Sequence, residues 1–409
     1  MSAQWIKLRY LADFNPGPPN AVRNSSESFP LYPMEAINNF KAPNTAISHE
    51  PVSKLLSGYS YLEPRDVAYA KVTPCFENGK GIIGTDLQDP SFATTELTVL
   101  RPKPGISQRY LAYLLQSPLF KNQAQSSMTG AGGLKRVSEQ FVKDIKLPVP
   151  SFREQEKIAD QLDHELAEIE ASIADQNQLL NLLHEHLKAS ISHHVQPAEL
   201  AEQAGVSEIT IDGISWRRTT VGRVTTINGG QVDPRVEPYA SMILIAPNHI
   251  ETGTGRILSS ETAKEQGADS GKYVARRGQL LFSKIRPTLL KSTIAPENCL
   301  CSADMYAISA DENWLTNKFL MYYFLSKNFQ DTADINSERV AMPKLNKETL
   351  ASTTLWIPNF TKQNSVEEIL KKEISNTLES VSLLKKSIHL NKEKYNIIIK
   401  ENLKQGGSR

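Results

Sequence analysis

Apolar residues recur every three or four positions along two long stretches, a heptad spacing typical of coiled-coil helices. The first stretch, residues 147–195, opens with Leu147-Pro148-Val149-Pro150, whose prolines end the preceding element. Ser151 and Glu154 have the spacing of a capping box, so we expect a helix to begin at Ser151. Its predicted seam comprises Leu162, Leu166, Ile169, Ile173, Leu180, Leu183 and Leu187, with Gln176 at one inward position.

A second stretch near the C-terminus repeats this plan. Asn359, which follows Leu355-Trp356-Ile357-Pro358, takes the N-cap position of Ser151, whereas Lys362 replaces Glu154. Because each predicted helix is apolar along one side, we expect the two helices to pack against each other. Periodicity alone leaves their relative direction open. The second seam comprises Leu370, Ile374, Val381, Leu384, Ile388, Tyr395 and Ile398, with Thr377 and Asn391 at polar positions.

The segment before the first helix resembles the segment between the helices, which indicates an internal duplication. Four blocks recur in the same order, and loop insertions between duplicated blocks explain why their spacing drifts. The segments 21–51 and 246–270 have no good counterpart in the other half. One scaffold with two unlike sets of loops is suited to two unlike targets. The four blocks align Trp5 with Trp216, Lys71 with Lys284, Tyr110 with Phe319, and Phe152 with Phe360.

Each half combines alternating strand-forming segments, Pro and Gly turns, and a short amphipathic helix near 110–124 or 319–329. We expect the early Trp of each half to pack into the strand-rich region. The expected fold class is α+β, with two duplicated α/β globules separated by two long helices. The expected boundaries are 1–150 for the first globule, 151–196 for the first helix, 197–211 for a polar linker, 212–357 for the second globule and 358–405 for the second helix.

Composition narrows the classes of function. The 46 Lys and Arg residues against 45 Asp and Glu give a net charge of +1, so nucleic-acid binding would require local clusters of positive charge. The three cysteines, Cys75, Cys299 and Cys301, argue against a disulfide framework and fit a reducing cytoplasm. The N-terminal sequence lacks a signal-peptide pattern, and no run approaches the roughly 18 apolar residues of a membrane span. We therefore expect a soluble, cytoplasmic protein that does not contact a membrane.

No catalytic constellation stands out. The stretch Gly130-Ala-Gly-Gly-Leu-Lys135 is too short for a phosphate-binding loop, and a plain loop is the favoured interpretation. His184 and His186 lie on different faces of a predicted helix, and Cys-x-Cys at Cys299 is a weak metal signal. We expect no metal site, no cofactor and no catalytic residue in this chain.

The remaining candidate chemistry is recognition of nucleic acid. Basic residues near predicted strand ends, beside Pro and Gly, are suited to contacts with phosphates or base edges. Surface solvation is the alternative for each lysine, and the helical spacing of the aromatic residues favours core packing over base stacking. The candidate DNA contacts are Lys71, Thr73, Lys80, Lys135 and Arg136 in the first half and Lys284, Arg286, Lys291, Arg339 and Lys344 in the second.

With two divergent globules, each followed by L-x-x-P-x-F-x-x-Q and a long heptad helix, the chain resembles the specificity subunit of type I restriction-modification systems. The resemblance covers nearly the whole chain and rests on the duplicated order of the blocks. Trp356 in place of Pro148 and Lys362 in place of Glu154 depart from the pattern only at the second junction. On this basis the two long helices are expected to pack as an antiparallel coiled coil between two target recognition domains.

The resemblance implies a non-catalytic protein that recognises an interrupted, bipartite site in double-stranded DNA. Each target recognition domain would bind one half-site, and the paired helices would set the spacing between the half-sites. The helices would also dock two methyltransferase subunits, and restriction and translocase subunits would join the complex. S-adenosylmethionine, ATP and Mg would be bound by those partners. The alternatives are a two-headed coiled-coil scaffold for protein–protein contacts and an enzyme with a cryptic active site, such as a nuclease.

Overall fold

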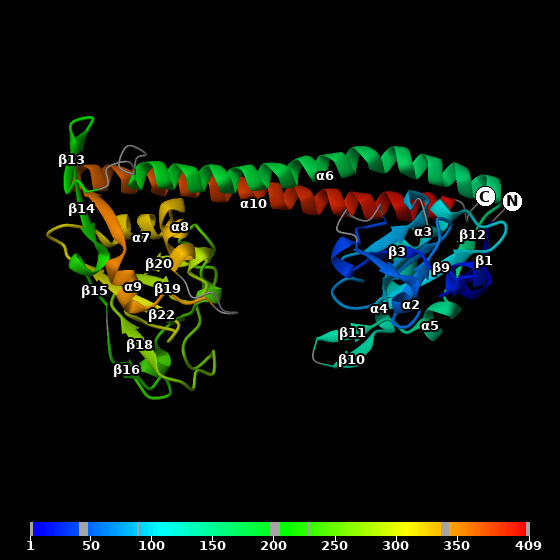
Figure 1. The fold of residues 1–409 in the computed structure, drawn as a ribbon, viewed down its shortest axis with the longest axis horizontal. Helices are drawn as coiled ribbons and strands as arrows, with labels where there is room; N and C mark the ends of the chain where they lie inside the picture. The colour runs from blue at the N-terminus through cyan, green and yellow to red at the C-terminus, as the bar shows by residue number, and fades with distance from the viewer. Residues whose placement is uncertain are drawn as a thin grey trace. The chain divides into compact units, whose positions relative to one another are not determined.

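The computed structural model describes residues 3–40, 48–87, 90–131, 133–196, 205–227, 229–336 and 343–405. The chain forms two compact units, and each long helix contributes a segment to both of them (Figure 1). Unit 1 comprises Met1–Asp175 and Lys386–Arg409, and unit 2 comprises Gln176–Lys385. Of the candidate DNA contacts, Arg339 lies outside the described residues.

The two long helices are α6 (Phe152–Val195) and α10 (Phe360–Gln405). They begin where the capping residues predict, because the Ser151 hydroxyl accepts from the N–H of Glu154 and the Asn359 amide oxygen accepts from the N–H of Lys362. The helices pair in the antiparallel direction. In unit 1, Asn402 donates to Glu165 and Asn391 to Ser172; in unit 2, Ser190 donates to Glu373. The predicted helix pair and its antiparallel direction are therefore confirmed.

All the predicted seam residues of α6 and α10 are buried or half-buried. The seam is also part of the cores of the units. Leu162 and Leu166 pack into the core of unit 1, and Leu187 and Leu370 pack into the core of unit 2. Seven further buried apolar residues in the described parts of these helices were not predicted, namely Ile158, Ala159, Ile191, Val195, Val366, Ile399 and Leu403.

Among the described residues, the strands of unit 1 form four sheets. The orders are β2-β9-β6-β7, β4-β3-β8-β5, β1-β12 and β10-β11. The strands are β1 (Gln4–Lys7), β2 (Ala12–Phe14), β3 (Ser28–Tyr32), β4 (Ser48–Pro51), β5 (Tyr59–Leu62), β6 (Val67–Ala70), β7 (Gly81–Ile83), β8 (Ser91–Thr94), β9 (Leu97–Pro102), β10 (Thr129–Ala131), β11 (Leu134–Arg136) and β12 (Lys146–Val149). The short helices are α1 (Asn20–Arg23), α2 (Val52–Leu55), α3 (Gln108–Gln116), α4 (Pro118–Ser126) and α5 (Glu139–Asp144).

Unit 2 has sheets in the orders β15-β22-β19-β20, β16-β18-β21-β17 and β13-β14-β23. Its strands are β13 (Glu208–Ile211), β14 (Ile214–Thr220), β15 (Thr225–Ile227), β16 (Gln231–Val232), β17 (Leu244–Ile245), β18 (Lys272–Ala275), β19 (Leu280–Ser283), β20 (Ser292–Ile294), β21 (Cys299–Cys301), β22 (Met305–Ala310) and β23 (Thr354–Pro358). Its short helices are α7 (Asn317–Leu325), α8 (Lys327–Asn336) and α9 (Lys347–Ser352).

The two units share one topology, as the internal repeat predicts. The sheet β2-β9-β6-β7 corresponds to β15-β22-β19-β20, and the three strands β3-β8-β5 correspond to β17-β21-β18. The fourth strand of the second sheet differs, because β4 lies beside β3 whereas β16 lies beside β18, at the opposite edge. The segment 21–51 contains β3, which pairs in parallel with β8 as β17 does with β21. The expectation that this segment lacks a counterpart is therefore wrong for β3.

The two early tryptophans are not equivalent, which corrects the sequence alignment. The N–H of Leu8 donates to Ile145 O in unit 1, and the N–H of Val221 donates to Thr353 O in unit 2, both at 2.9 Å. Counting back from these positions, Ala3 corresponds to Trp216 and Trp5 to Arg218. Trp216 is buried, whereas Trp5 is 56% exposed. The expectation that both tryptophans pack into the core is wrong for Trp5.

Three further expectations differ from the structure. Each single amphipathic helix is a pair, α3–α4 and α7–α8, because Ser117 and Ser326 cap a second helix through the N–H of Phe120 and of Phe329. The end of the predicted linker forms β13, because Asp212 and Gly213 both have positive φ and make a tight hairpin turn. The Gly-rich stretch expected to be a plain loop contributes to the β10–β11 hairpin.

Candidate nucleic-acid interface

In unit 1, the structure brings together four of the candidate residues, Lys71, Thr73, Lys135 and Arg136. The segment after β6 runs antiparallel to β11, with Val72 opposite Arg136. The N–H of Thr73 donates to Lys135 O, and the Thr73 hydroxyl accepts from the N–H of Lys135, both at 2.9 Å. The N–H of Val137 donates to Lys71 O at 2.8 Å. The four candidate residues therefore lie on two adjacent antiparallel segments, 71–73 and 134–136, which we call the ribbon of unit 1.

Arg136 is engaged within the protein. Its guanidinium donates to both carboxylate oxygens of Glu96, at 2.7 and 3.0 Å. The bond from Arg136 holds the pKa of Glu96 below its ordinary value, so the pair stays ionised near neutral pH. Lys135, the next residue along β11, is exposed.

In unit 2, the segments 284–286 and 343–345 form the equivalent ribbon. Ile285 lies opposite Lys344, and the N–H of Arg286 donates to Pro343 O at 2.8 Å. The ammonium group of Lys284 lies 5.1 Å from the ring centroid of Tyr306 and 5.9 Å from that of Tyr273. Burial, and then the charge of Lys344, lower the pKa of Lys284. Lys344 and Arg286 are exposed. Basic side chains thus converge at the same place in both units.

The ammonium groups of Lys80 and Lys291, unlike the exposed side chains of the ribbons, bond to backbone carbonyls of loops. The Lys80 ammonium donates to Met34 O at 2.8 Å, and the Lys291 ammonium donates to Pro247 O at 2.7 Å. Both contacts are part-buried, and both carbonyls belong to 3₁₀ turns, Met34–Ala36 and Pro247–His249. Each lysine therefore ties a loop of its unit to the sheet, a task that the sequence did not indicate.

A glutamine joins each long helix to its globule. Gln155 accepts from the N–H of Ser107 at 2.8 Å and donates to Gly105 O and Pro150 O at 3.1 and 2.9 Å. Gln363 makes the same three bonds in unit 2, with the N–H of Thr316 at 3.0 Å and with Trp314 O and Pro358 O at 2.9 Å. Both side chains are buried. The Gln of the repeated motif therefore fixes the direction in which the helix leaves the globule.

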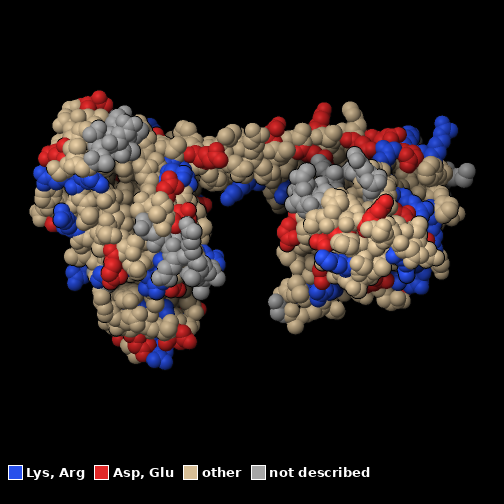
Figure 2. All heavy atoms as spheres, in the orientation of Figure 1, with Lys and Arg blue, Asp and Glu red and all other residues tan. Residues whose placement is uncertain are grey.

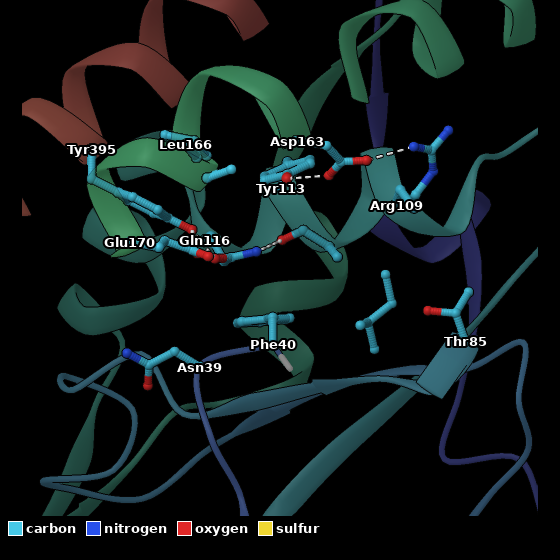
Figure 3. Close-up of a pocket in the computed structure, with 13 residues that line it drawn as sticks. Asn39, Phe40, Thr85, Arg109, Tyr113, Gln116, Asp163, Leu166, Glu170 and Tyr395 are labelled. Atoms are coloured by element: carbon cyan, nitrogen blue, oxygen red, sulfur yellow. Dashed lines mark hydrogen bonds and ion pairs between the residues drawn. The ribbon is translucent and has the colours of Figure 1, made fainter. Parts of the chain in front are cut away.

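In unit 1, charged residues reinforce this junction. Arg109 of α3 donates to Glu156, Asp160 and Asp163 of α6 at 2.5 to 2.8 Å. Tyr113 donates to Asp163 at 2.5 Å, and Figure 3 shows the bonds from Arg109 and Tyr113 to Asp163. Burial, and then the bond to Asp163, raise the pKa of Tyr113, which remains a donor at neutral pH.

A cavity of about 250 Å³ adjoins these residues. Gln116, Glu170 and Tyr395 converge on it, and the Tyr395 hydroxyl donates to the Gln116 oxygen at 3.1 Å (Figure 3). In the matching helix of unit 2, the buried residues Met321 and Leu325 occupy the positions of Ala112 and Gln116. The two junctions therefore hold their globules with different side chains.

The surface charge is mixed. Figure 2 shows Lys and Arg interspersed with Asp and Glu over the visible face of each unit, in keeping with the net charge of +1. Within the described ranges, no group of three or more His, Cys, Asp or Glu is placed to hold a metal ion. None of the helices described is both long enough and apolar enough to cross a membrane.

Comparison with known proteins shows which family and which solved structures the chain resembles. A family model described as "Type I restriction modification DNA specificity domain" matches residues 77–180 and 220–399. The chain is 29% identical over 276 residues to the type I restriction enzyme EcoDI specificity subunit of Escherichia coli, which covers 60% of this chain and 61% of that protein. It is 33% identical over 157 residues to the EcoAI specificity subunit of E. coli, covering 38% and 26%. The matches therefore span less than two thirds of these relatives.

The fold is similar to that of a chain from a structural study of complex assembly and conformational transition in the type I R-M system. The TM-score is 0.69, the sequence identity is 15%, and the match covers 98% of this chain and 97% of the other. At this identity the likeness concerns the fold alone.

Proposed function

Because the chain belongs to the family of type I restriction modification DNA specificity domains, we propose that it recognises an interrupted DNA site on behalf of a restriction and modification complex. Unit 1 would bind one half-site and unit 2 the other. The observation that carries the proposal is the duplicated ribbon, which presents basic side chains after β6 in unit 1 and after β19 in unit 2.

The differences between the units support two unlike half-sites. The scaffold is common, but the exposed basic residues of the ribbons differ, with Lys135 and Arg136 in unit 1 and Arg286 and Lys344 in unit 2. The fourth strand of the second sheet also lies at opposite edges. Because base edges in the major groove differ in their donor and acceptor patterns, different side chains on one scaffold would select different sequences.

The helix pair is suited to setting the distance between the half-sites. α6 has 44 residues and α10 has 46, and both are continuous helices. At about 1.5 Å per residue, one heptad of coil corresponds to roughly 10 Å, or about three base-pair steps of DNA. A change in coil length would therefore change the spacer without changing the half-sites.

The outer surface of the helices is suited to docking a helical partner. Leu383, Leu390 and Ile397 of α10 repeat every seven residues and are 60%, 63% and 53% exposed. A heptad stripe outside the seam has the spacing that a further helix would pack against. We assign it to the methyltransferase subunits, which would bring S-adenosylmethionine; ATP and Mg would belong to the restriction and translocase subunits. This chain would supply recognition and no chemistry.

DNA selection tests the proposal. The full-length chain, co-purified with its methyltransferase subunit, is incubated with a library of randomised duplexes at several salt concentrations, and the bound DNA is sequenced. We expect two blocks of fixed bases separated by a fixed number of unspecified bases, with an affinity that falls steeply as salt rises. Binding without sequence preference, or no binding, would favour a protein–protein scaffold. Cleavage of the duplexes by the chain alone would favour a nuclease.

A further inference from the structure

The hairpin formed by β10 and β11 is the most exposed strand pair of unit 1. Every described residue from Thr129 to Arg136 is exposed, including Leu134, which is 48% exposed. A large aliphatic side chain on a hairpin gains nothing from folding when it stays in water. Leu134 is therefore available for contact with a partner that meets the hairpin.

The base of this hairpin is held rigidly. The segment 71–73 forms a third strand beside β11 through the backbone bonds of Lys71 and Thr73 described above. The Thr73 hydroxyl also donates to Gly133 O at 2.9 Å. The bidentate pair between Arg136 and Glu96 fixes the end of β11. The hairpin is therefore a stiff extension of the sheet that contains β6.

The two strands of the hairpin approach closely at Gly130. Gly130 has a φ of +148°, and a Cβ atom there would lie 2.2 Å from Leu134 O. No residue with a side chain fits at this position, so the hairpin presents bare backbone there. The major groove of B-DNA admits a two-stranded β-ribbon, and an apolar side chain can contact the methyl group of thymine there.

We propose that the β10–β11 hairpin enters the major groove of the half-site bound by unit 1, where Leu134 contacts a base edge and Lys135 a phosphate. Thr73 and Arg136 act as positioning residues, since their side chains bond within the protein. This inference rests on the proposed function and adds the element that determines the specificity of unit 1. Leu134 is the apolar member of the contact and Lys135 the charged one.

The test compares Leu134→Ala with Leu56→Ala in the full-length chain co-purified with its methyltransferase subunit. Leu56 is a matched control, because it is a leucine of unit 1 with 44% exposure. We expect Leu134→Ala to lower discrimination by about fivefold or more at one or two adjacent positions of one half-site. The other half-site and the spacer stay unchanged, Leu56→Ala behaves as wild type, and Leu134→Met retains most of the discrimination.

Identical base preferences for Leu134→Ala and wild type would overturn the inference while leaving the proposed function intact. Absence of specific binding by the wild-type complex would overturn both.

The roles of the charged residues are tested by salt dependence. Lys135→Ala should weaken binding to all sequences and lower the salt slope by about one, as the loss of a phosphate contact does. Glu96→Ala separates two roles for Arg136. If Arg136 positions the hairpin, Glu96→Ala lowers discrimination at the same positions as Leu134→Ala. Tighter binding by Glu96→Ala would mean that the released Arg136 contacts DNA, and would overturn its positioning role.

Discussion

Gln155 and Gln363 are each buried at the first turn of a long helix and make three hydrogen bonds apiece. In both units the amide oxygen accepts from the N-cap region of α3 or α7, and the amide nitrogen donates to two carbonyls. Because these partners are buried or part-buried backbone groups, loss of the amide removes their protein partner. One side chain type at one position thus couples each globule to its helix.

Gln155→Ala should therefore destabilise unit 1 by about 2–4 kcal/mol, because two buried backbone groups and one part-buried group lose their partner. Thermal or denaturant unfolding of the full-length chain measures the effect. Gln161→Ala is the control, since Gln161 is exposed on the same helix and should change stability by less than about 0.5 kcal/mol. Equal stabilities for the two variants would contradict the role of the buried amide.

In the sequence, this glutamine was recognisable only as a residue that recurs in both copies of the repeated motif, and its hydrogen bonds were not predictable. Its bonding partners lie about fifty residues earlier in the chain, at Gly105 and Ser107 or at Trp314 and Thr316. Tertiary contacts of this kind have no local pattern. The Ser151 and Asn359 caps were predictable, because a cap and the N–H it bonds are three residues apart. The sequence alignment paired Trp5 with Trp216 because the two residues are identical. The structurally equivalent residue of Trp216 is Ala3, which does not resemble it and lies two positions earlier than Trp5.

At the scale of elements, the long helices were predictable because a heptad seam is periodic along many turns. The β10–β11 hairpin and β13 were not expected, since each strand is only three or four residues long. The Asp212-Gly213 turn carried a hairpin signal that was available in the sequence. The convergence of Lys71 with Arg136, and of Lys284 with Lys344, depends on strand pairing over about sixty residues and required the structure.

The exposed stripe on α10 gives a test at this scale. The triple variant Leu383→Ser, Leu390→Ser and Ile397→Ser should lose co-purification with the methyltransferase subunit, because the docking surface becomes polar. Its helical content and unfolding temperature should stay close to wild type, since these side chains are more than half exposed. The control Val381→Ser alters a buried seam residue and should lower stability by about 2 kcal/mol or more. Undiminished co-purification of the triple variant would contradict the assignment of this surface.

At the scale of the whole molecule, the antiparallel register makes the helix pair adjustable. In unit 1 Ser172 bonds to Asn391, and in unit 2 Ser190 bonds to Glu373. The matched segments for deletion are residues 176–182 of α6 and 381–387 of α10, which lie between these two pairs in the sequence. Deleting both segments removes one heptad from each helix and keeps the remaining seams in phase. The variant should bind a site whose spacer is shorter by about three base pairs, with both half-sites unchanged. DNA selection measures the outcome, and altered half-sites at the original spacing would contradict the role of the helices as a spacer.

The most direct test of the central claim is a map of methyladenine in an unmodified host that expresses this chain together with its methyltransferase subunit, obtained by long-read sequencing. We expect one interrupted motif, modified on both strands and absent when this chain is omitted. That result would give both half-sites at once and assign sequence specificity to this chain. Methylation that persists without this chain, or no methylation although the two proteins co-purify, would contradict the account.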